Sequence, residues 1–388
     1  MIVYYISPSV IPSRTANSIH VISMCEALTQ LGYKTVLFFK SDNLTKADSN
    51  KFINQFYGVN SDGIELNEYS SKTARGVEFF IAILALSHFI IDTAKGRTPK
   101  IVIARNLYAA LLFGIFLRKK VVYETHSPEC GFRKKIQRLL LNSPKIYTVV
   151  ISNALKKIIC EFHCIHDRNI HVFHDAARAG AQKLNKLQRI EQRRELFEQK
   201  IELKKYKNFI GYFGHLYAGR GIEVIQGVAE KNPEQAFVIY GGNEGEIKKY
   251  RCDNHIKNIF FMGHISPNLA HNAMRLMDIL LMPYQKNVSV GLKDVDTSKW
   301  MSPMKMFEYL SAGVPIISSD MPVLREILKD GDNAILVSPS DIEAWSNTLR
   351  KIINNPDLAN GLGFNAYCQY KDKHTWKYRA KGMVDLLL

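Results

Sequence analysis

The segment WMSPMKMFEYLSAGVP, residues 300–315, predicts a short helix that leads directly into a buried strand. Ser302 is a favourable helix cap, Pro303 suits the first helical position, and the Gly-Val-Pro run ends the helix. Lys305 and Glu308 are three residues apart and therefore share one side of this helix. Either they form an exposed ion pair worth about 0.3 kcal/mol, or they contact a ligand.

Short apolar runs alternate with helical patterns along both halves of the chain, which predicts parallel sheets. In the first half we expect strands at 2–6, 34–39, 100–105, 119–125, 146–152 and 170–176. In the second half we expect strands at 208–214, 236–242, 258–264, 279–284, 314–319 and 334–339. The sequence therefore predicts an α/β fold with two Rossmann-like, doubly wound domains.

The chain has 388 residues, which favours two domains. The stretch from 178 to 207 is highly charged and poor in β-branched residues, so we place the domain boundary there. We expect an N-terminal domain at 1–178, a charged linker at 179–206 and a nucleotide-binding domain at 207–365. Two such domains would face a central cleft, because doubly wound sheets bind ligands at the carboxyl ends of their strands.

The composition, 46% hydrophobic and 23% charged, is typical of a globular protein with a substantial core. Six scattered cysteines include only one near pair, so no zinc site is indicated. The N-terminus lacks the pattern of a signal peptide and predicts a first strand. The longest apolar run, 77–91, is shorter than the roughly 20 residues of a spanning helix and contains Glu78 and His88. We therefore expect it to be a buried helix.

The formal net charge of +16 predicts an anionic partner, such as nucleic acid, a membrane surface or a phosphorylated substrate. Residues 131–141 suit either an interfacial amphipathic helix or a solvated basic helix packed on the sheet. No recognised nucleic-acid module is present, so we expect an anionic membrane surface rather than nucleic acid. The location would then be cytoplasmic, at the inner face of the membrane. The basic residues expected at this surface are Arg118, Lys119, Lys120, Arg133, Lys134, Lys135 and Arg138.

A glycine-rich turn follows the first strand of the second half, in GYFGHLYAGRGIEVI at 211–225. Its glycines let backbone amides approach a ligand closely, and the following helix N-terminus attracts phosphate. His215 and Arg220 add side-chain donors, and arginine can bind phosphate through two hydrogen bonds. The alternative is an ordinary strand-to-helix turn with a solvated arginine, since the spacing matches neither a P-loop nor a dinucleotide fingerprint.

The helix that begins near residue 303 supplies a second candidate anion site, because its N-terminus would point toward the same cleft. Lys305 adds a positive charge there. Glu308, one turn further along, could hold ribose hydroxyls, as acidic residues do in other nucleotide sites.

Residues 302–328, SPMKMFEYLSAGVPIISSDMPVLREIL, resemble the donor-binding signature of GT-B glycosyltransferases of family 4, which are retaining and use nucleotide sugars. The segment at 211–225 resembles the family's phosphate loop, and YETH at 123–126 resembles its strand that ends in a functional histidine. HTWKYRAKGM at 374–383 resembles its C-terminal helix, so we expect 366–388 to form a helix that returns to the N-terminal domain. The resemblance spans nearly the whole chain.

The resemblance implies specific roles. Arg220 and Lys305 would neutralise the donor diphosphate, and His126 would lie near the donor sugar; these three are the expected catalytic residues. The loop after the first strand would face the acceptor with Ser13, Arg14 and Asn17. The implied donor-binding residues are Gly214, His215, Arg220, Gly263, Ile265, Ser302, Pro303, Met304, Lys305 and Glu308.

The sequence departs from the family pattern in the phosphate loop, where relatives often have Arg at His215 and Lys at Arg220. A histidine there would make phosphate binding partly dependent on pH. Trp300 stands where many members have an acidic residue, eight positions before Glu308. The loop PSRTANS at 12–18 replaces a Gly-Gly loop that is common in the family.

Together these features predict a retaining glycosyltransferase that moves a sugar from a UDP- or GDP-sugar to a carbohydrate, possibly lipid-linked, acceptor in surface polysaccharide synthesis. We expect no cofactor and no essential metal, since no Asp-rich motif accompanies the site, and we expect the domains to close over the donor. Two alternatives remain open: a nucleotide-sugar epimerase, and a non-catalytic protein that binds sugar nucleotides.

Overall fold

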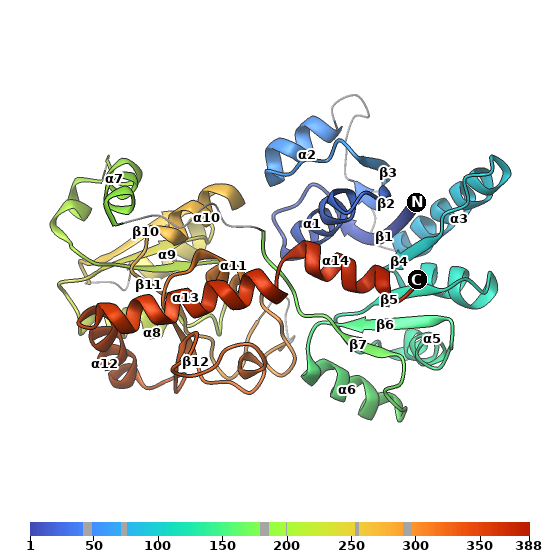
Figure 1. Ribbon diagram of the computed structural model, residues 1–388. Helices are drawn as coiled ribbons and strands as arrows, with labels where there is room; N and C mark the ends of the chain where they lie inside the picture. Colours follow the sequence, from blue (N-terminus) through green and yellow to red (C-terminus); the bar gives the residue numbers. More distant parts are fainter. Residues whose placement is uncertain (42–48, 71–75, 179–185, 199, 253–255, 290–295) are drawn as a thin grey trace. The chain divides into compact units, whose positions relative to one another are not determined.

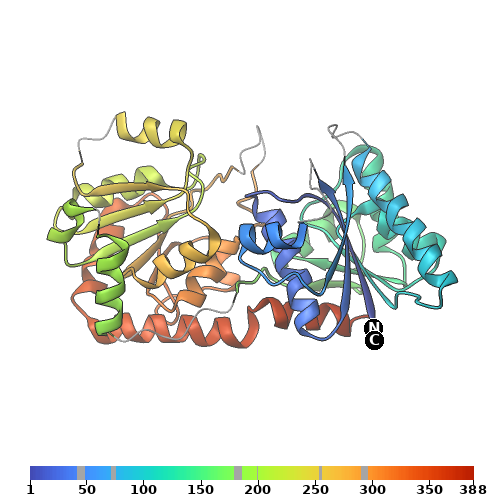
Figure 2. The same cartoon turned by 90° about the horizontal axis from the view of Figure 1, so that it is seen from above.

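The computed structural model describes residues 1–41, 49–70, 76–178, 186–198, 200–252, 256–289 and 296–388. The chain divides into two compact units, each of which is described separately below. The first unit comprises Met1–Asp175 and Thr375–Leu388, and the second comprises Ala176–His374. Both chain ends therefore lie in the first unit (Figures 1 and 2).

The first unit is built on a seven-stranded sheet with the order β3-β2-β1-β4-β5-β6-β7. All its strand pairs are parallel, and the order reverses between the neighbours β1 and β4. β4 and β5 are buried at every residue, as expected for parallel strands covered on both faces. The strands are β1 (Ile2–Val10), β2 (Lys34–Ser41), β3 (Ile64–Ser70), β4 (Ile101–Ala104), β5 (Val121–Glu124), β6 (Ile146–Val150) and β7 (Ile170–Val172).

Helices cover this sheet, and α3, α4, η1 and α5 contribute to one core cluster with the alternate residues of β1, β2, β4 and β5. The C-terminal helix α14 packs against α1 within the same unit (Figure 1). Thr375 caps α14 by accepting a hydrogen bond from the Tyr378 amide. The helices are α1 (Ala16–Gln30), α2 (Ser49–Tyr57), α3 (Val77–Ala94), α4 (Leu107–Ala110), the π-helix η1 (Leu111–Phe116), α5 (Gly131–Leu141), α6 (Asn153–His163) and α14 (Trp376–Asp385).

The second unit has a six-stranded sheet with the order β10-β9-β8-β11-β12-β13, and its strands are also paired in parallel. Its chain order reverses between β8 and β11. The strands are β8 (Phe209–Phe213), β9 (Ala236–Tyr240), β10 (Ile259–Gly263), β11 (Ile279–Met282), β12 (Ile316–Ser319) and β13 (Ile335–Val337).

Helices α8, α9, α12 and α13 share a core cluster with this sheet, and α11 packs against α10 and α13. The remaining helical elements are short turns or lie at the start of the unit. The helices are α7 (Lys186–Leu196), η2 (Ile201–Lys205), α8 (Ile222–Glu230), α9 (Glu244–Cys252), α10 (Pro267–Arg275), α11 (Met304–Ala312), η3 (Leu324–Glu326), α12 (Ile342–Ile353) and α13 (Pro356–Lys373).

The predicted fold of two doubly wound, Rossmann-like sheets is confirmed, and every predicted strand is present. Strand β3 was missed, because its sequence IELNEYS is polar and only Ile64 is fully buried at this sheet edge. The helix α11 begins one residue later than predicted, so that Pro303 rather than Ser302 occupies the capping position.

The prediction of a buried helix at 77–91 is wrong. Helix α3 spans 18 residues, and only 28% of them are buried, because one side alone packs on the sheet. By length and composition it is the one helix in the described chain that could cross a membrane.

The two units divide at a different position from the predicted boundary in 179–206, since α7 already belongs to the second unit. Arg193 of α7 donates hydrogen bonds to the Leu276 carbonyl at 2.7 Å and to Asp278 at 2.9 Å, which fixes α7 there. The last helix returns to the first unit only from Thr375, whereas α13 stays in the second unit.

Candidate active site

The predicted donor residues of the second unit gather where its chain order reverses. The turn after β8 carries the glycine-rich loop, and α11 begins in the connection between the neighbouring strands β11 and β12. Ligands of doubly wound sheets bind at this switch point. The Tyr309 hydroxyl accepts a hydrogen bond from the Phe213 amide at 2.8 Å, which ties α11 to the end of β8.

Gly214 makes room for the Lys305 side chain. A Cβ at Gly214 would lie 2.7 Å from Cε and 2.8 Å from Nζ of Lys305, so no other residue fits without displacing the lysine. Gly214 also has a φ of 142°, which an L side chain rarely adopts. At the next strand end, a Cβ at Gly241 would clash with the Gly214 carbonyl. Gly214 therefore leaves room for Lys305, and Gly241 leaves room for the Gly214 carbonyl; we call these two glycines the glycine notch.

Lys305 is buried, and its Nζ lies 3.7 Å from the centre of the Tyr212 ring and 5.4 Å from that of Tyr284. Burial and the nearby Arg220 charge hold the pKa of Lys305 well below its usual value, although Glu308 opposes this shift. Among the described residues, Lys305 forms no ion pair. An anionic ligand would relieve this cost by neutralising the charge.

Arg220 lies beside the lysine and is held in place. Its Nη1 donates to the Tyr284 hydroxyl at 2.9 Å, and its Nη2 donates to the Ser289 carbonyl at 3.1 Å. Nε is buried and has no hydrogen-bond partner in the described structure. Arg220 and Lys305 thus place a guanidinium and a basic amine beside the glycine notch.

Glu308 does not pair with Lys305, since no ion pair joins them among the described residues. Burial raises the pKa of Glu308, while Lys305 and Arg178 oppose the shift. The exposed ion pair considered from the sequence is therefore excluded. Lys305 and Glu308 are therefore each available to contact a different group of a ligand.

His215 is exposed, and its ring stacks on Tyr217 with centroids 4.7 Å apart. The partial burial of the ring, together with Arg220, lowers the pKa of His215, so at neutral pH it offers a hydrogen-bond donor rather than a charge. The pH dependence of phosphate binding that we expected from His215 is therefore shifted to lower pH.

The other predicted donor residues lie at the same carboxyl edge of the sheet or at the start of α11. Gly263 ends β10, and its carbonyl accepts from the Gly241 amide at 2.7 Å. Ile265 follows it and is half-buried, while Ser302 is buried and Pro303 precedes the first helical residue, Met304. Trp300 is half-buried in the preceding turn.

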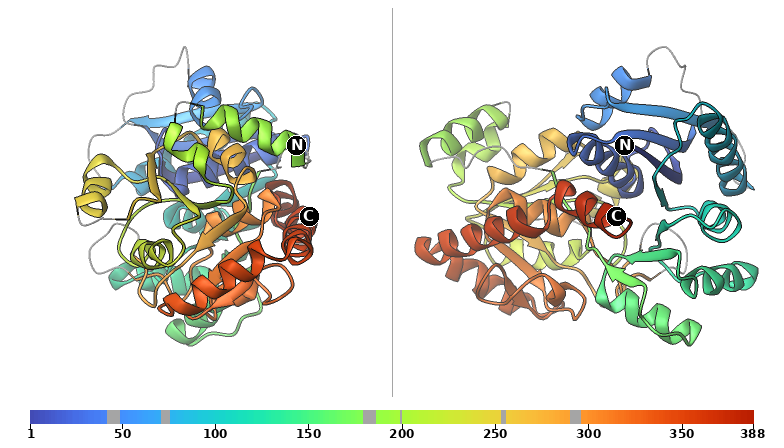
Figure 3. Two further views of the ribbon diagram at one scale, coloured as in Figure 1. Left: turned by 90° about the vertical axis from the view of Figure 1, so that its left-hand side faces the viewer. Right: turned by 45° about the vertical axis from the view of Figure 1, so that its right-hand side comes forward.

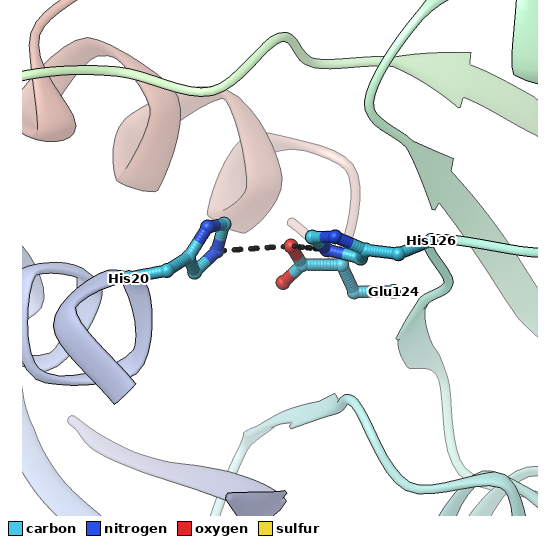
Figure 4. Close-up of side chains that lie close together, drawn as sticks. All are labelled: His20, Glu124 and His126. Carbon is cyan, nitrogen blue, oxygen red and sulfur yellow. Dashed lines mark hydrogen bonds and ion pairs between the residues drawn. The ribbon is translucent and has the colours of Figure 1, made fainter. Parts of the chain in front are cut away.

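In the first unit, His126 lies just past the end of β5 and is hydrogen-bonded to Glu124 of that strand. Nε2 of His126 is 3.0 Å from Oε1 of Glu124 (Figure 4). Glu124 is the last residue of β5 and His126 follows only two residues later, which brings these two side chains together. Burial and Arg105 lower the pKa of His126 to about 4, with Glu124 opposing, so the ring is neutral at pH 7. Because a carboxylate only accepts, we assign the proton to Nε2, which leaves Nδ1 as an acceptor.

Glu124 is the centre of a buried charge network that the sequence did not reveal. Burial disfavours its ionisation, but His20, Arg105 and Arg379 hold the pKa of Glu124 well below its usual value. Arg379 of α14 donates to Glu124 Oε1 at 2.7 Å. His20 of α1 lies with Nε2 3.0 Å from the same oxygen (Figure 4) and with Nδ1 2.9 Å from Asp175. The one signal of this network in the sequence is Glu124, a charged residue at the end of an otherwise apolar strand.

His20, Glu124 and His126 offer three ligand atoms within 4.8 Å of one another, a spacing that a metal ion could bridge. However, the Arg379 guanidinium already lies 2.7 Å from the shared Glu124 oxygen. A second cation at that oxygen would be repelled, so the donor set fits a hydrogen-bonded network better than a metal centre.

We expect the stability of the first unit to fall as the pH decreases from about 6.5 to about 4. In this window an unfolded histidine binds a proton that folded His126, with its pKa lowered to about 4, does not bind. Over this pH range, calorimetry should show a smaller fall in the free energy of unfolding for His126→Gln than for the parent protein. His166→Gln, at an exposed histidine, is the control and should show the same fall as the parent. Identical pH profiles for His126→Gln and the parent would contradict this assignment.

The predicted acceptor residues follow β1 and are largely engaged in local structure. The Ser13 amide donates to the Tyr57 hydroxyl at 2.7 Å, and Asn17 donates to Ser9 at 2.8 Å. Arg14 is exposed.

Four of the seven predicted membrane-facing basic residues make contacts within the unit: Arg133, Lys134, Lys119 and Lys120. Arg133 forms ion pairs with Glu129 at 2.6 Å and with Glu78 at 2.9 Å. Nζ of Lys134 lies 3.8 Å from the centre of the Phe162 ring. Nζ of Lys119 lies 5.7 Å from the centre of the Phe89 ring, and Lys120 donates to the Leu387 carbonyl at 3.4 Å, although both lysines are exposed. Arg118, Lys135 and Arg138 are also exposed.

Residues 193–369 match the family model described as glycosyl transferases group 1. The matched segment, which is less than half of the chain, is therefore similar to group 1 glycosyltransferases. It contains the glycine notch, Arg220, Lys305 and Glu308, and it lies within the second unit.

Proteins that are similar in sequence include glycosyltransferases. An uncharacterized glycosyltransferase of Methanocaldococcus jannaschii is 23% identical over 286 residues, 69% of this chain and 67% of that protein. A phosphatidyl-myo-inositol mannosyltransferase of Mycobacterium leprae is 24% identical over 152 residues, but these cover only 39% of this chain and 37% of that one.

Several solved structures share the fold. HepE of Anabaena, in complex with UDP, superposes with a TM-score of 0.70 at 13% identity, covering 100% of this chain and 99% of that one. A glycosyltransferase of Rickettsia africae gives a TM-score of 0.72 at 14% identity, with 100% and 97% covered. The two Rossmann-like units therefore have the GT-B architecture.

Proposed function

We propose that the protein is a retaining glycosyltransferase of family 4 that transfers a sugar, in the hexosyl class, from a nucleotide-sugar to a carbohydrate acceptor. The observation that supports this most directly is the buried Lys305 amine, which lies beside Arg220 and against Gly214 without an anionic partner among the described residues. A diphosphate would supply the missing negative charge.

In this proposal, Arg220 and Lys305 stabilise the charge that develops on the leaving diphosphate, which is the usual source of rate enhancement at such a site. Amides near Gly214 and Met304 add hydrogen bonds, while the Gly214 amide itself donates to the Tyr240 carbonyl at 2.9 Å. Glu308 accepts hydrogen bonds from the ribose hydroxyls, and backbone groups from Gly263 to Ile265 contact the base.

The neutral imidazole of His126 has its own part in the proposal. With Nε2 donating to Glu124, Nδ1 can accept a hydrogen bond from a hydroxyl of the donor sugar. Arg14, with Ser13 and Asn17, is assigned to the acceptor side.

The donor is expected to be a UDP- or GDP-sugar, and UDP is favoured because HepE, which shares the fold, was solved with UDP and with UDP-glucose. A thermal-shift screen with UDP, GDP, ADP and their sugars should raise the melting temperature with one base only. A protein that responds to none of them would not fit a nucleotide-sugar site.

The reaction itself has a direct readout. Transfer predicts that free nucleoside diphosphate appears only when acceptor is present, and retention predicts that the product keeps the anomeric configuration of the donor. Inverted product, followed by NMR, would overturn the retaining assignment. An epimerase would instead convert the sugar nucleotide without an acceptor.

For the acceptor we propose a lipid-linked carbohydrate of surface polysaccharide synthesis, since similar proteins include a putative teichuronic acid biosynthesis glycosyltransferase of Bacillus subtilis and the phosphatidyl-myo-inositol mannosyltransferases. The protein would act in the cytoplasm, at the inner face of the membrane, where its exposed basic residues attract anionic lipid.

A further inference from the structure

The exposed side of α3 is apolar along the whole length of the helix. Five large apolar side chains on it are exposed: Phe79 (46%), Phe80 (49%), Ile83 (40%), Ile90 (61%) and Ile91 (49%). Together with Ser87 and Ala94 they fall within an arc of about 120° at 3.6 residues per turn. We call these seven residues the α3 face.

No charged residue interrupts the α3 face. Glu78 lies outside it and is paired with Arg133 at 2.9 Å. Asp92 also lies outside it, accepting from the Tyr4 hydroxyl at 2.8 Å and pairing with Arg97 at 3.2 Å. The inner side of α3, including Ile81 and Phe89, is packed in the core.

The end of η1 extends this surface and adds positive charge. Phe116 is 69% exposed and Leu117 is 37% exposed. Nζ of Lys119 lies 5.7 Å from the centre of the Phe89 ring, so the end of η1 borders the C-terminal half of α3. The exposed cations that follow α3 and η1 are Lys95, Arg97, Lys100, Arg118, Lys119 and Lys120. Figures 1 and 3 show α3 at the periphery of the first unit.

We propose that the α3 face and the end of η1 bind the surface of a bilayer that contains anionic lipid, with the apolar side chains entering the headgroup boundary. Large exposed apolar patches on soluble domains mark interaction sites. An apolar helix face bordered by lysine and arginine matches a lipid surface, which supplies hydrocarbon and negative charge together.

The structure favours this occupant over two others. If the same face of a second copy packed here, its carboxylates would have to complement the cations. The two acids of α3, Glu78 and Asp92, are already engaged with Arg133 and with Tyr4 and Arg97. A spanning helix is also disfavoured, because lifting α3 out would uncover the core residues of its inner side. The helix therefore lies on the membrane instead of crossing it.

This inference deepens the membrane association in the proposed function. It keeps Arg118, Lys119 and Lys120 of the predicted basic surface but replaces the α5 part of that surface with α3. It accounts for the apolar residues that the sequence had assigned to a buried helix. Binding to vesicles needs neither donor nor acceptor, so its failure would leave the glycosyltransferase assignment untouched.

The test is co-sedimentation of the full chain with vesicles of phosphatidylcholine alone and of phosphatidylcholine mixed with phosphatidylglycerol. The parent should sediment with the mixed vesicles and only weakly with phosphatidylcholine. Ile83→Glu with Ile90→Glu should lower the bound fraction about tenfold or more. Arg118→Glu with Lys119→Glu should remove the preference for anionic lipid. Leu269→Glu, at a residue of the second unit that is 58% exposed, is the matched control and should bind as the parent does.

A parent that binds neither vesicle overturns the proposal, and so does a double-glutamate variant that binds as well as the parent. If the parent instead forms a dimer that this variant disperses, the α3 face is an interface between copies and the proposal is wrong. A preserved nucleotide-induced thermal shift and far-UV circular dichroism check that each variant is folded.

Discussion

Lys305→Met is expected to lower transfer about 100- to 1,000-fold, while the unliganded protein stays as stable as the parent or becomes more stable. The amine is buried beside Arg220, and its charge is unfavourable without a ligand. Methionine keeps much of the packing against Tyr212 and removes that charge. The melting temperature of the ligand-free variant should therefore rise or remain unchanged, whereas the increase in melting temperature caused by nucleotide should disappear.

The combination of outcomes separates a binding role from a structural one. Lys299→Met, at an exposed lysine on the segment before α11, is the control and should change neither quantity. Glu308→Ala should weaken the response to nucleoside diphosphate as well, through the ribose. If Lys305→Met kept parental transfer, the site assignment would be wrong, and a large loss of stability would make Lys305 a structural residue.

Arg379→Met is expected to destabilise the first unit by about 3–5 kcal/mol, the usual effect of removing one member of a buried ion pair. Arg379 is 2% exposed, and it donates to Glu124 at 2.7 Å and to the carbonyls of His174 and Phe173. Without it, the Glu124 carboxylate keeps its burial but loses its shortest contact. Calorimetry should show that the unfolding transition of the first unit moves to lower temperature.

A control variant and a double variant test whether the loss of stability comes from the contact between Arg379 and Glu124. Lys377→Met, at an exposed residue of the same helix, should leave the transition in place. Adding Glu124→Gln to Arg379→Met should recover part of the loss, because the carboxylate is no longer left buried and unpaired. A change within about 0.5 kcal/mol for Arg379→Met would show that α14 is not held through this contact.

The positions of the proposed donor-site residues could largely be predicted from the sequence, because the elements that carry them follow local rules. Gly214 and Arg220 lie in one turn, Lys305 and Glu308 lie on one helix, and both elements follow strands whose apolar patterns are clear. The parallel-sheet pattern was enough to place them at one edge. The sequence could not decide whether Lys305 and Glu308 pair with each other, since a spacing of three residues permits an ion pair as readily as two separate contacts.

The network around His126 needed the tertiary structure. His20, Glu124, Asp175 and Arg379 come from four distant parts of the chain, and nothing local signals that they meet. The last helix could be predicted as a helix, but its buried arginine gains a partner only when α14 packs on the first unit. The seven-residue α3 face was hidden in a similar way, because an apolar run does not say how much of its circumference other elements will cover.

What the sequence determined by itself was the alternation of strands and helices, the two doubly wound sheets and the glycine-rich turn with its lysine-bearing helix. These follow from periodicity and from backbone preferences, which act between neighbours in the chain. The tertiary structure decided which charges are buried, which of them meet and which apolar side chains stay exposed. Those properties depend on contacts between distant segments, and desolvation rather than sequence spacing sets their energies.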